Sequence, residues 1–181
     1  MAKKPEPTPE RLAATTRRNL AHLQRAILNY EVMRGLELAK GAPFAIHVIH
    51  ASLKNDYLAN CMKVFEDTRK VATFWSVLAA SPHVTASLNA EGMPVDEIRA
   101  VAAGLKVIRD RTHFHIGAES VEAPADVWKD AGLTGDRLYR SVLAAWRALN
   151  FHQAEAGREP LSVPDIDKEA LKRMVEFVRE Q

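Results

Sequence analysis

An arginine inside an apolar stripe is the residue of this sequence that most clearly requires a partner. Arg109 lies in a stretch where Ile98, Val101, Leu105 and Ile108 recur at spacings of three and four, the pattern of a core-facing helix. An unpaired guanidinium on such a face is costly, so Arg109 must pair with a carboxylate, bind an anion or face a cleft. The second and third options make it a candidate functional residue.

Two histidines, His113 and His115, follow Arg109, and imidazole gains and loses a proton near neutral pH. On a helical wheel of about 100° per residue, centred on Leu105, Arg109 lies about 40° to one side of the stripe. On the same wheel His113 is about 40° from Arg109, and His115 is about 120° from it. Geometry on one helix therefore favours His113, whereas Arg109 and His115 converge better across a two-fold interface between two copies.

The elements that position these residues are all predicted to be helical, because no stretch alternates at period two for long enough to make a strand. We expect five or six helices in an all-α bundle, over about residues 9–41, 43–66, 71–80, 94–116, 134–157 and 166–178. Residues 83–93 and 118–133 are expected to be connections, the first with one helical turn at most. Residues 1–8 should form a loose tail before a single domain over residues 9–181.

The charge, cysteine content and hydropathy of the chain exclude several classes of protein. The formal net charge of +2 excludes a uniformly basic surface, although a local basic groove is compatible with it. Cys61 is the only cysteine, which excludes an intrachain disulfide and a multi-thiolate zinc site and fits a reducing compartment. No apolar run is long enough to cross a bilayer, and Lys3 and Lys4 are not followed by the apolar core of a secretory signal. We therefore expect a cytoplasmic protein without membrane contact.

The segment from Ile108 to His115 resembles the Arg-polar-x4-His signature of the HEPN superfamily. Within that superfamily it is most similar to the Leu-Arg-Asp-Lys-x-x-Ala-His segment of the abortive-infection U-type HEPN-like proteins. The stretch from Leu53 to Leu78 also resembles that group, with a long helix, Asp67 near its end and a short apolar helix. Phe114 departs from the pattern, since the residue before the motif histidine is usually small.

The resemblance implies a homodimeric phage-defence or toxin-type protein that cleaves RNA without a metal or other cofactor, with an antitoxin as a further partner. In that reading His115 moves the proton of the RNA 2′-hydroxyl, Arg109 holds the phosphate and Asp110 orients them. The product would be a 2′,3′-cyclic phosphate. Lys106, Arg111 and His113 would contribute to substrate binding.

Other interpretations remain open. Arg109 could pair with Glu66 or Asp67 and His115 could satisfy carbonyls at a helix end, which would leave a non-catalytic module that binds nucleotides, RNA or a protein. His47 and His50, one turn apart, could share a metal, although no Glu-x-x-His pair accompanies them. Phe74, Trp75, Trp128 and Trp146 are expected in the core or an interface rather than as base-stacking platforms.

Overall fold

The computed structural model describes residues 8–36, 43–66, 73–114 and 124–180. Over these residues the chain is all-helical, with eight α-helices and one π-helical turn. In chain order they are α1 (Pro9–Gly35), α2 (Phe44–Phe65), α3 (Phe74–Ala80), α4 (Pro82–Ala90), α5 (Val95–Arg109), η1 (Asp110–Phe114), α7 (Pro124–Asp130), α8 (Gly135–Glu155) and α9 (Lys168–Glu180). The all-α expectation is confirmed, and the expected number of helices was too small.

The two additional helices lie in segments that we expected to be connections. Helix α4 follows directly after α3: Ser81 precedes it and Pro82 is its first residue. A proline is well placed there because its fixed φ suits a first turn and its missing N–H is not needed. Val84 and Leu88, four residues apart, are fully buried and hold α4 against the core. Helix α7 likewise falls within the expected connection 118–133.

Helix α1 ends earlier than its periodicity indicated. Thr8 caps its first turn by accepting a hydrogen bond from the backbone N–H of Arg11, as expected, but the helix stops at Gly35 rather than near Gly41. Gly35 allows a close approach, because a Cβ there would lie 2.7 Å from Cδ1 of Leu171 on α9. Helix α9 can therefore lie close to the end of α1 at this glycine.

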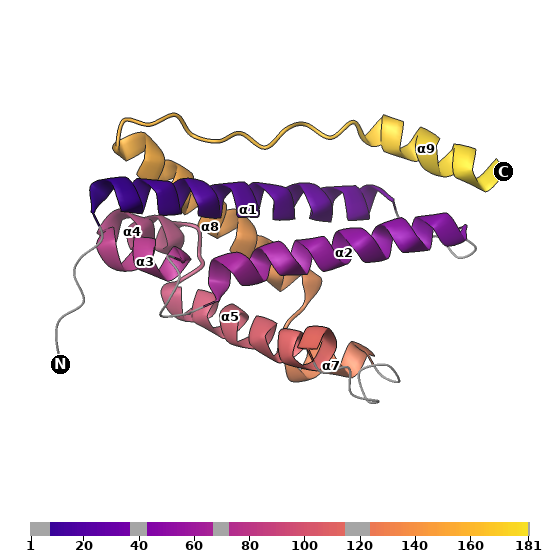
Figure 1. Ribbon diagram of the computed structural model, residues 1–181, viewed down its shortest axis with the longest axis horizontal. Coiled ribbons are helices and arrows are strands. Elements are labelled where there is room, and N and C mark those ends of the chain that lie inside the picture. Colours follow the sequence, from indigo (N-terminus) through magenta and orange to yellow (C-terminus); the bar gives the residue numbers. More distant parts are fainter. Residues whose placement is uncertain (1–7, 37–42, 67–72, 115–123, 181) are drawn as a thin grey trace.

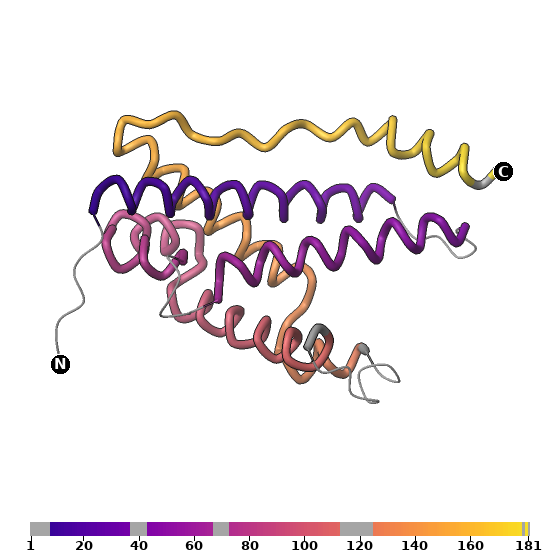
Figure 2. The backbone as a smooth tube through the Cα atoms, viewed as in Figure 1, coloured from indigo at the N-terminus to yellow at the C-terminus, as the bar shows by residue number. Residues whose placement is uncertain are grey.

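Helices α1, α2, α5 and α8 form the body of the bundle, and α3 and α4 lie at one end of it (Figure 1). The apolar core joins these elements and includes Leu20, Cys61, Phe74, Ile98 and Leu149. Residues 156–167 run in an extended path along α1 before α9 begins (Figure 2). Asn150 anchors this path through two hydrogen bonds with the backbone of Leu161, 2.8 and 3.0 Å long.

The first half of α2 and part of α9 are less buried than their apolar patterns predicted. Ile49 is 38% exposed and Met174 is 37% exposed, so neither belongs to the core. Here α2 packs only against a small satellite cluster that contains Leu36, Ile46 and Val175. No helix in the described part of the chain is both long and apolar enough to span a membrane.

A buried contact between α8 and the start of α4 should make stability depend on pH. Nδ1 of His152 lies 3.0 Å from Oγ of Ser81, and burial, together with Arg158 and His83, lowers the pKa of His152. The unfolded chain then binds more protons than the folded chain between the lowered pKa and about 6.5. The free energy of unfolding is therefore not reduced by His152 above about pH 7, and it decreases as the pH falls below about 6.5.

We expect His152→Gln to flatten the decrease in melting temperature between about pH 7 and pH 5.5. The matched control is His47→Gln at an exposed histidine of α2, which should retain the wild-type profile. Thermal melts across this pH range measure both. Equal slopes for His152→Gln and wild type would contradict the assignment.

Candidate nucleic-acid interface

Helix α5 presents an apolar face to the core and a basic face to the outside. Its first turn carries Asp96 and Glu97, and its last turn carries Lys106 and Arg109, so both ends complement the helix dipole. Arg137 of α8 donates two hydrogen bonds to Glu97, 2.6 and 2.9 Å long, which connect the first turn of α5 to the start of α8. The basic face is thereby held in a fixed orientation on the bundle.

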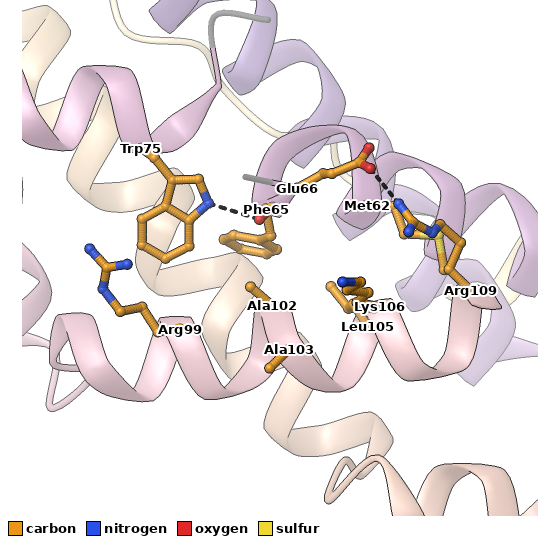
Figure 3. A pocket seen from close by; sticks show the side chains of 10 residues that line it. All are labelled: Met62, Phe65, Glu66, Trp75, Arg99, Ala102, Ala103, Leu105, Lys106 and Arg109. Carbon is orange, nitrogen blue, oxygen red and sulfur yellow. Dashed lines mark hydrogen bonds and ion pairs between the residues drawn. The ribbon is translucent and has the colours of Figure 1, made fainter. Parts of the chain in front are cut away.

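A hollow of about 490 Å³, here called the α5 hollow, lies between α5, the end of α2 and the start of α3 (Figure 3). Three cations of α5 line it: Arg99, Lys106 and Arg109. Their spacing of seven and three residues places them along one side of the helix. Ala102 and Ala103, which also line the hollow, are too small to fill the space between them.

Arg109, the residue that required a partner, binds two carboxylates. Its guanidinium forms an ion pair with Glu66 at the end of α2 and a second one, 2.8 Å long, with Asp110. The hydrogen bond to Asp110, and the charges of Asp110 and Glu66, raise the pKa of Arg109. Its side chain is 24% exposed, so the charge sits at the edge of the hollow rather than in the core.

Trp75 supplies an aromatic surface at the other end of the α5 hollow. Its indole Nε1 donates a 2.8 Å hydrogen bond to the carbonyl of Phe65, which fixes the ring (Figure 3). The guanidinium carbon of Arg99 lies 4.9 Å from the ring centroid, within cation–π distance. Trp75 packs against the core, as expected, and its partly buried ring also lines the hollow. Sequence spacing offers no signal for this pairing, because Trp75 and Arg99 are on different helices.

Lys106 differs from its neighbours because no contact among the described residues holds its charged group, whereas Arg99 lies over the ring of Trp75 and Arg109 forms ion pairs. It is exposed and lies between Arg99 and Arg109 in the hollow. A solvated ammonium without a fixed partner can bind an incoming anion without first breaking an ion pair. Of the three cations, Lys106 is therefore the one best placed to recruit a phosphate.

The motif around Arg109 does not continue as an α-helix. Helix α5 ends at Arg109, and residues 110–114 form the π-helical turn η1, with Oγ1 of Thr112 donating to the carbonyl of Ile108 at 2.6 Å. A π-turn closes hydrogen bonds from i to i+5, so it contains more residues per turn than an α-helix. The α-helical wheel therefore does not apply to His113. Such turns occur frequently at functional sites.

The other predicted site residues are placed as follows. Asp110 is engaged with Arg109, and Arg111 forms a 2.6 Å ion pair with Asp130 of α7, so Arg111 is not among the residues that line the hollow. The backbone of His113 lies in η1, but its side chain falls outside the described part of the structure, as do Asp67 and the whole of His115. The structure thus places Lys106 and Arg109 in one hollow, joins Asp110 to Arg109 and directs Arg111 toward α7.

The described residues contain no group of three or more His, Cys, Asp or Glu side chains arranged to hold a metal ion. His47 is exposed. Asp56, further along α2, accepts hydrogen bonds from Arg25 at 2.6 Å and Asn29 at 2.7 Å. Its carboxylate therefore joins α1 to α2.

The ion pair between Arg109 and Glu66 gives a direct test of how much this arginine stabilises the fold. Because both side chains are partly exposed, we expect Arg109→Ala to lower the free energy of unfolding by about 1 kcal/mol or less. Glu66→Gln should have a similar effect, and the double variant should lose less than the sum of the two. Urea unfolding of the four proteins measures the coupling. A loss of several kcal/mol for Arg109→Ala would instead assign it a mainly structural role.

Comparisons of this chain with protein-family models, with curated proteins and with solved structures gave no significant match.

Proposed function

We propose that this chain is a HEPN-like helical protein that binds RNA in the α5 hollow. The observation that carries the proposal is the set of groups in that hollow, three cations in a row on α5 and a fixed indole opposite them. Cationic grooves that follow a phosphate backbone, combined with aromatic or guanidinium surfaces for stacking, are how proteins bind single-stranded nucleic acid. The hollow contains both kinds of group.

Each group has a distinct role in this proposal. Lys106 binds a backbone phosphate through its unpaired ammonium. Arg99, held against Trp75, presents a guanidinium plane on which an unstacked base can stack. Arg109 keeps its charge because its pKa is raised, and it reaches a phosphate when Glu66 gives up the shared ion pair.

We further propose that the motif cleaves the bound RNA without a metal. His115 accepts the proton of a 2′-hydroxyl, and the oxygen attacks the adjacent phosphorus. The bond to the 5′-oxygen breaks, and that oxygen takes a proton from water, which leaves a 2′,3′-cyclic phosphate and a 5′-hydroxyl. Arg109 stabilises the charge on the phosphate, and Asp110 orients the guanidinium through the bond that joins them. In this proposal two copies of the chain present their motifs to one another, and an antitoxin that covers the hollow would silence a phage-defence toxin.

The test is cleavage of a generic single-stranded RNA in EDTA by wild type, Arg109→Ala and His115→Ala. Loss of an acid–base group costs about 10²–10⁴ in rate, so both variants should be at least about 100-fold slower than wild type. Arg147→Ala, at an arginine of α8 that pairs with Glu91, is the control and should cleave normally. Equal cleavage by all four proteins, or by none, would remove the catalytic proposal and leave the RNA-binding proposal to be judged by affinity.

The ion pair between Arg109 and Glu66 also favours a second function. Because Arg109 links α5 to Glu66 of α2, the motif helix could act only as part of a non-catalytic interaction module. That reading predicts that Arg109→Ala lowers the melting temperature and leaves RNA affinity unchanged. Filter binding and thermal melts of the same variant distinguish the two functions.

A further inference from the structure

A second cavity borders the middle of α2 and shares no lining residue with the α5 hollow, which borders the end of α2. It has a volume of about 680 Å³ and is bounded by α1, α2, α7 and the start of α8. This volume falls in the range of sites that hold small molecules, about 300–1,000 Å³. We call it the aromatic cavity, because Tyr30, Tyr57 and Trp128 are among its lining residues.

Neighbouring side chains hold the two tyrosine rings of the cavity in place. Tyr30 stacks on Tyr139, with centroids 4.0 Å apart and an interplanar angle of 16°, and its hydroxyl donates a 3.0 Å hydrogen bond to Asp136. Tyr57 is only 2% exposed and lies with its ring centroid 5.4 Å from that of Tyr30. Rings fixed in this way lose little entropy when a flat molecule packs against them.

The charged groups of the aromatic cavity are all basic. Arg34 lies one turn after Tyr30 on α1, and Lys54 on α2 has its ammonium 5.5 Å from the ring centroid of Trp128. Among the described residues that line the cavity there is no carboxylate, and neither cation forms an ion pair with another described residue. His50 also lines it, and burial lowers the pKa of His50, so this side chain is an uncharged hydrogen-bonding group at neutral pH.

We propose that the aromatic cavity binds a small, flat aromatic molecule that carries an anionic group. The ring packs against Tyr30 and Trp128, and the anionic group lies between Arg34 and Lys54. Both walls contribute, because one cation comes from α1 and the other from α2. This site is separate from the α5 hollow and does not depend on RNA binding there.

The three tryptophans give a readout for each cavity. Trp128 lines the aromatic cavity, Trp75 lines the α5 hollow and Trp146 lines neither. Titration of the ¹⁵N-labelled full chain with adenosine monophosphate or indole-3-acetate should therefore move the indole N–H signal of Trp128 and leave those of Trp75 and Trp146 in place. Trp128→Phe identifies the signal. Which of the two ligands binds shows whether the cavity takes a nucleotide or an aromatic carboxylate.

The variants separate charge from shape. Arg34→Ala and Lys54→Ala should each weaken binding at least about tenfold, and adenosine or indole, which lack the anionic group, should bind at least about tenfold more weakly than the charged ligands. Lys63→Ala, at an exposed lysine of α2 outside both cavities, is the matched control and should bind within about twofold of wild type.

The proposal is overturned if neither ligand moves the Trp128 signal, if the Trp75 signal moves instead, or if both cavity variants bind like wild type. A failure here leaves RNA cleavage and RNA affinity unaffected, so the two proposals fail separately.

Discussion

Gly104→Ala is expected to destabilise the fold by about 1–3 kcal/mol, the cost of overpacking a filled site. In an open helix the same change is favourable by about 1 kcal/mol, because alanine has the higher helix propensity. Here a Cβ would lie 2.5 Å from the carbonyl oxygen of Ala131 and 2.7 Å from Cγ of Leu133. The oxygen belongs to the backbone and cannot rotate away, so α5 would have to move from the segment that links α7 to α8.

Gly135→Ala is the matched control, since nothing lies within 4 Å of a Cβ at the start of α8. It should be neutral or slightly stabilising, because alanine restricts the unfolded chain. Thermal melts should show a loss of several degrees for Gly104→Ala and none for Gly135→Ala, at about 2–4 °C per kcal/mol for a chain of this size. A melting temperature for Gly104→Ala at or above that of wild type would show that α5 and the α7–α8 link do not pack this closely.

Lys106→Glu is expected to weaken RNA binding at least about tenfold near 0.1 M salt. The change replaces an attractive charge in the middle of the α5 hollow with a repulsive one. The lost attraction to a phosphate and the added repulsion are each about 1 kcal/mol or more at 4 Å in a solvated site. Lys106 is exposed and has no ion-pair partner among the described residues, so the fold should not be affected. Loss of affinity without loss of stability is the expected signature.

Salt dependence makes this test more specific. Losing one phosphate contact should reduce the slope of log affinity against log salt by about 0.7 for a single-stranded RNA. Lys172→Glu, at an exposed lysine of α9, carries the same charge change away from the hollow and should keep the wild-type slope. Equal weakening by both variants would show that net charge, rather than the α5 hollow, governs binding.

The local periodicity of the sequence predicted most of the helices, because burial of one face imposes a spacing of three and four. The stripe of Ile98, Val101, Leu105 and Ile108 is buried on α5 as expected. The sequence offered Thr134 or Asp136 as the cap of α8, and the structure has Thr134, whose side chain accepts from the N–H of Arg137. These features depend on neighbours within one or two turns, which a single sequence displays directly.

Short helices and helix ends were harder to predict. Helices α4 and α7 have nine and seven residues, too few to show a full amphipathic period, and packing against the rest of the bundle stabilises them. The end of α5 could not be predicted either, because the change from an α-helix to the π-turn η1 leaves the hydrophobic pattern unbroken.

The requirement that Arg109 have a partner was evident from the sequence alone, since a charge beside an apolar stripe is costly in any fold. Which partner it takes was decided by the tertiary structure, which brings Glu66 from 43 residues away. The hollow itself also arises only in three dimensions, because Trp75 of α3 and Arg99 of α5 meet only in the folded chain. Contacts between distant segments depend on how whole helices pack, and no spacing along the chain encodes that arrangement.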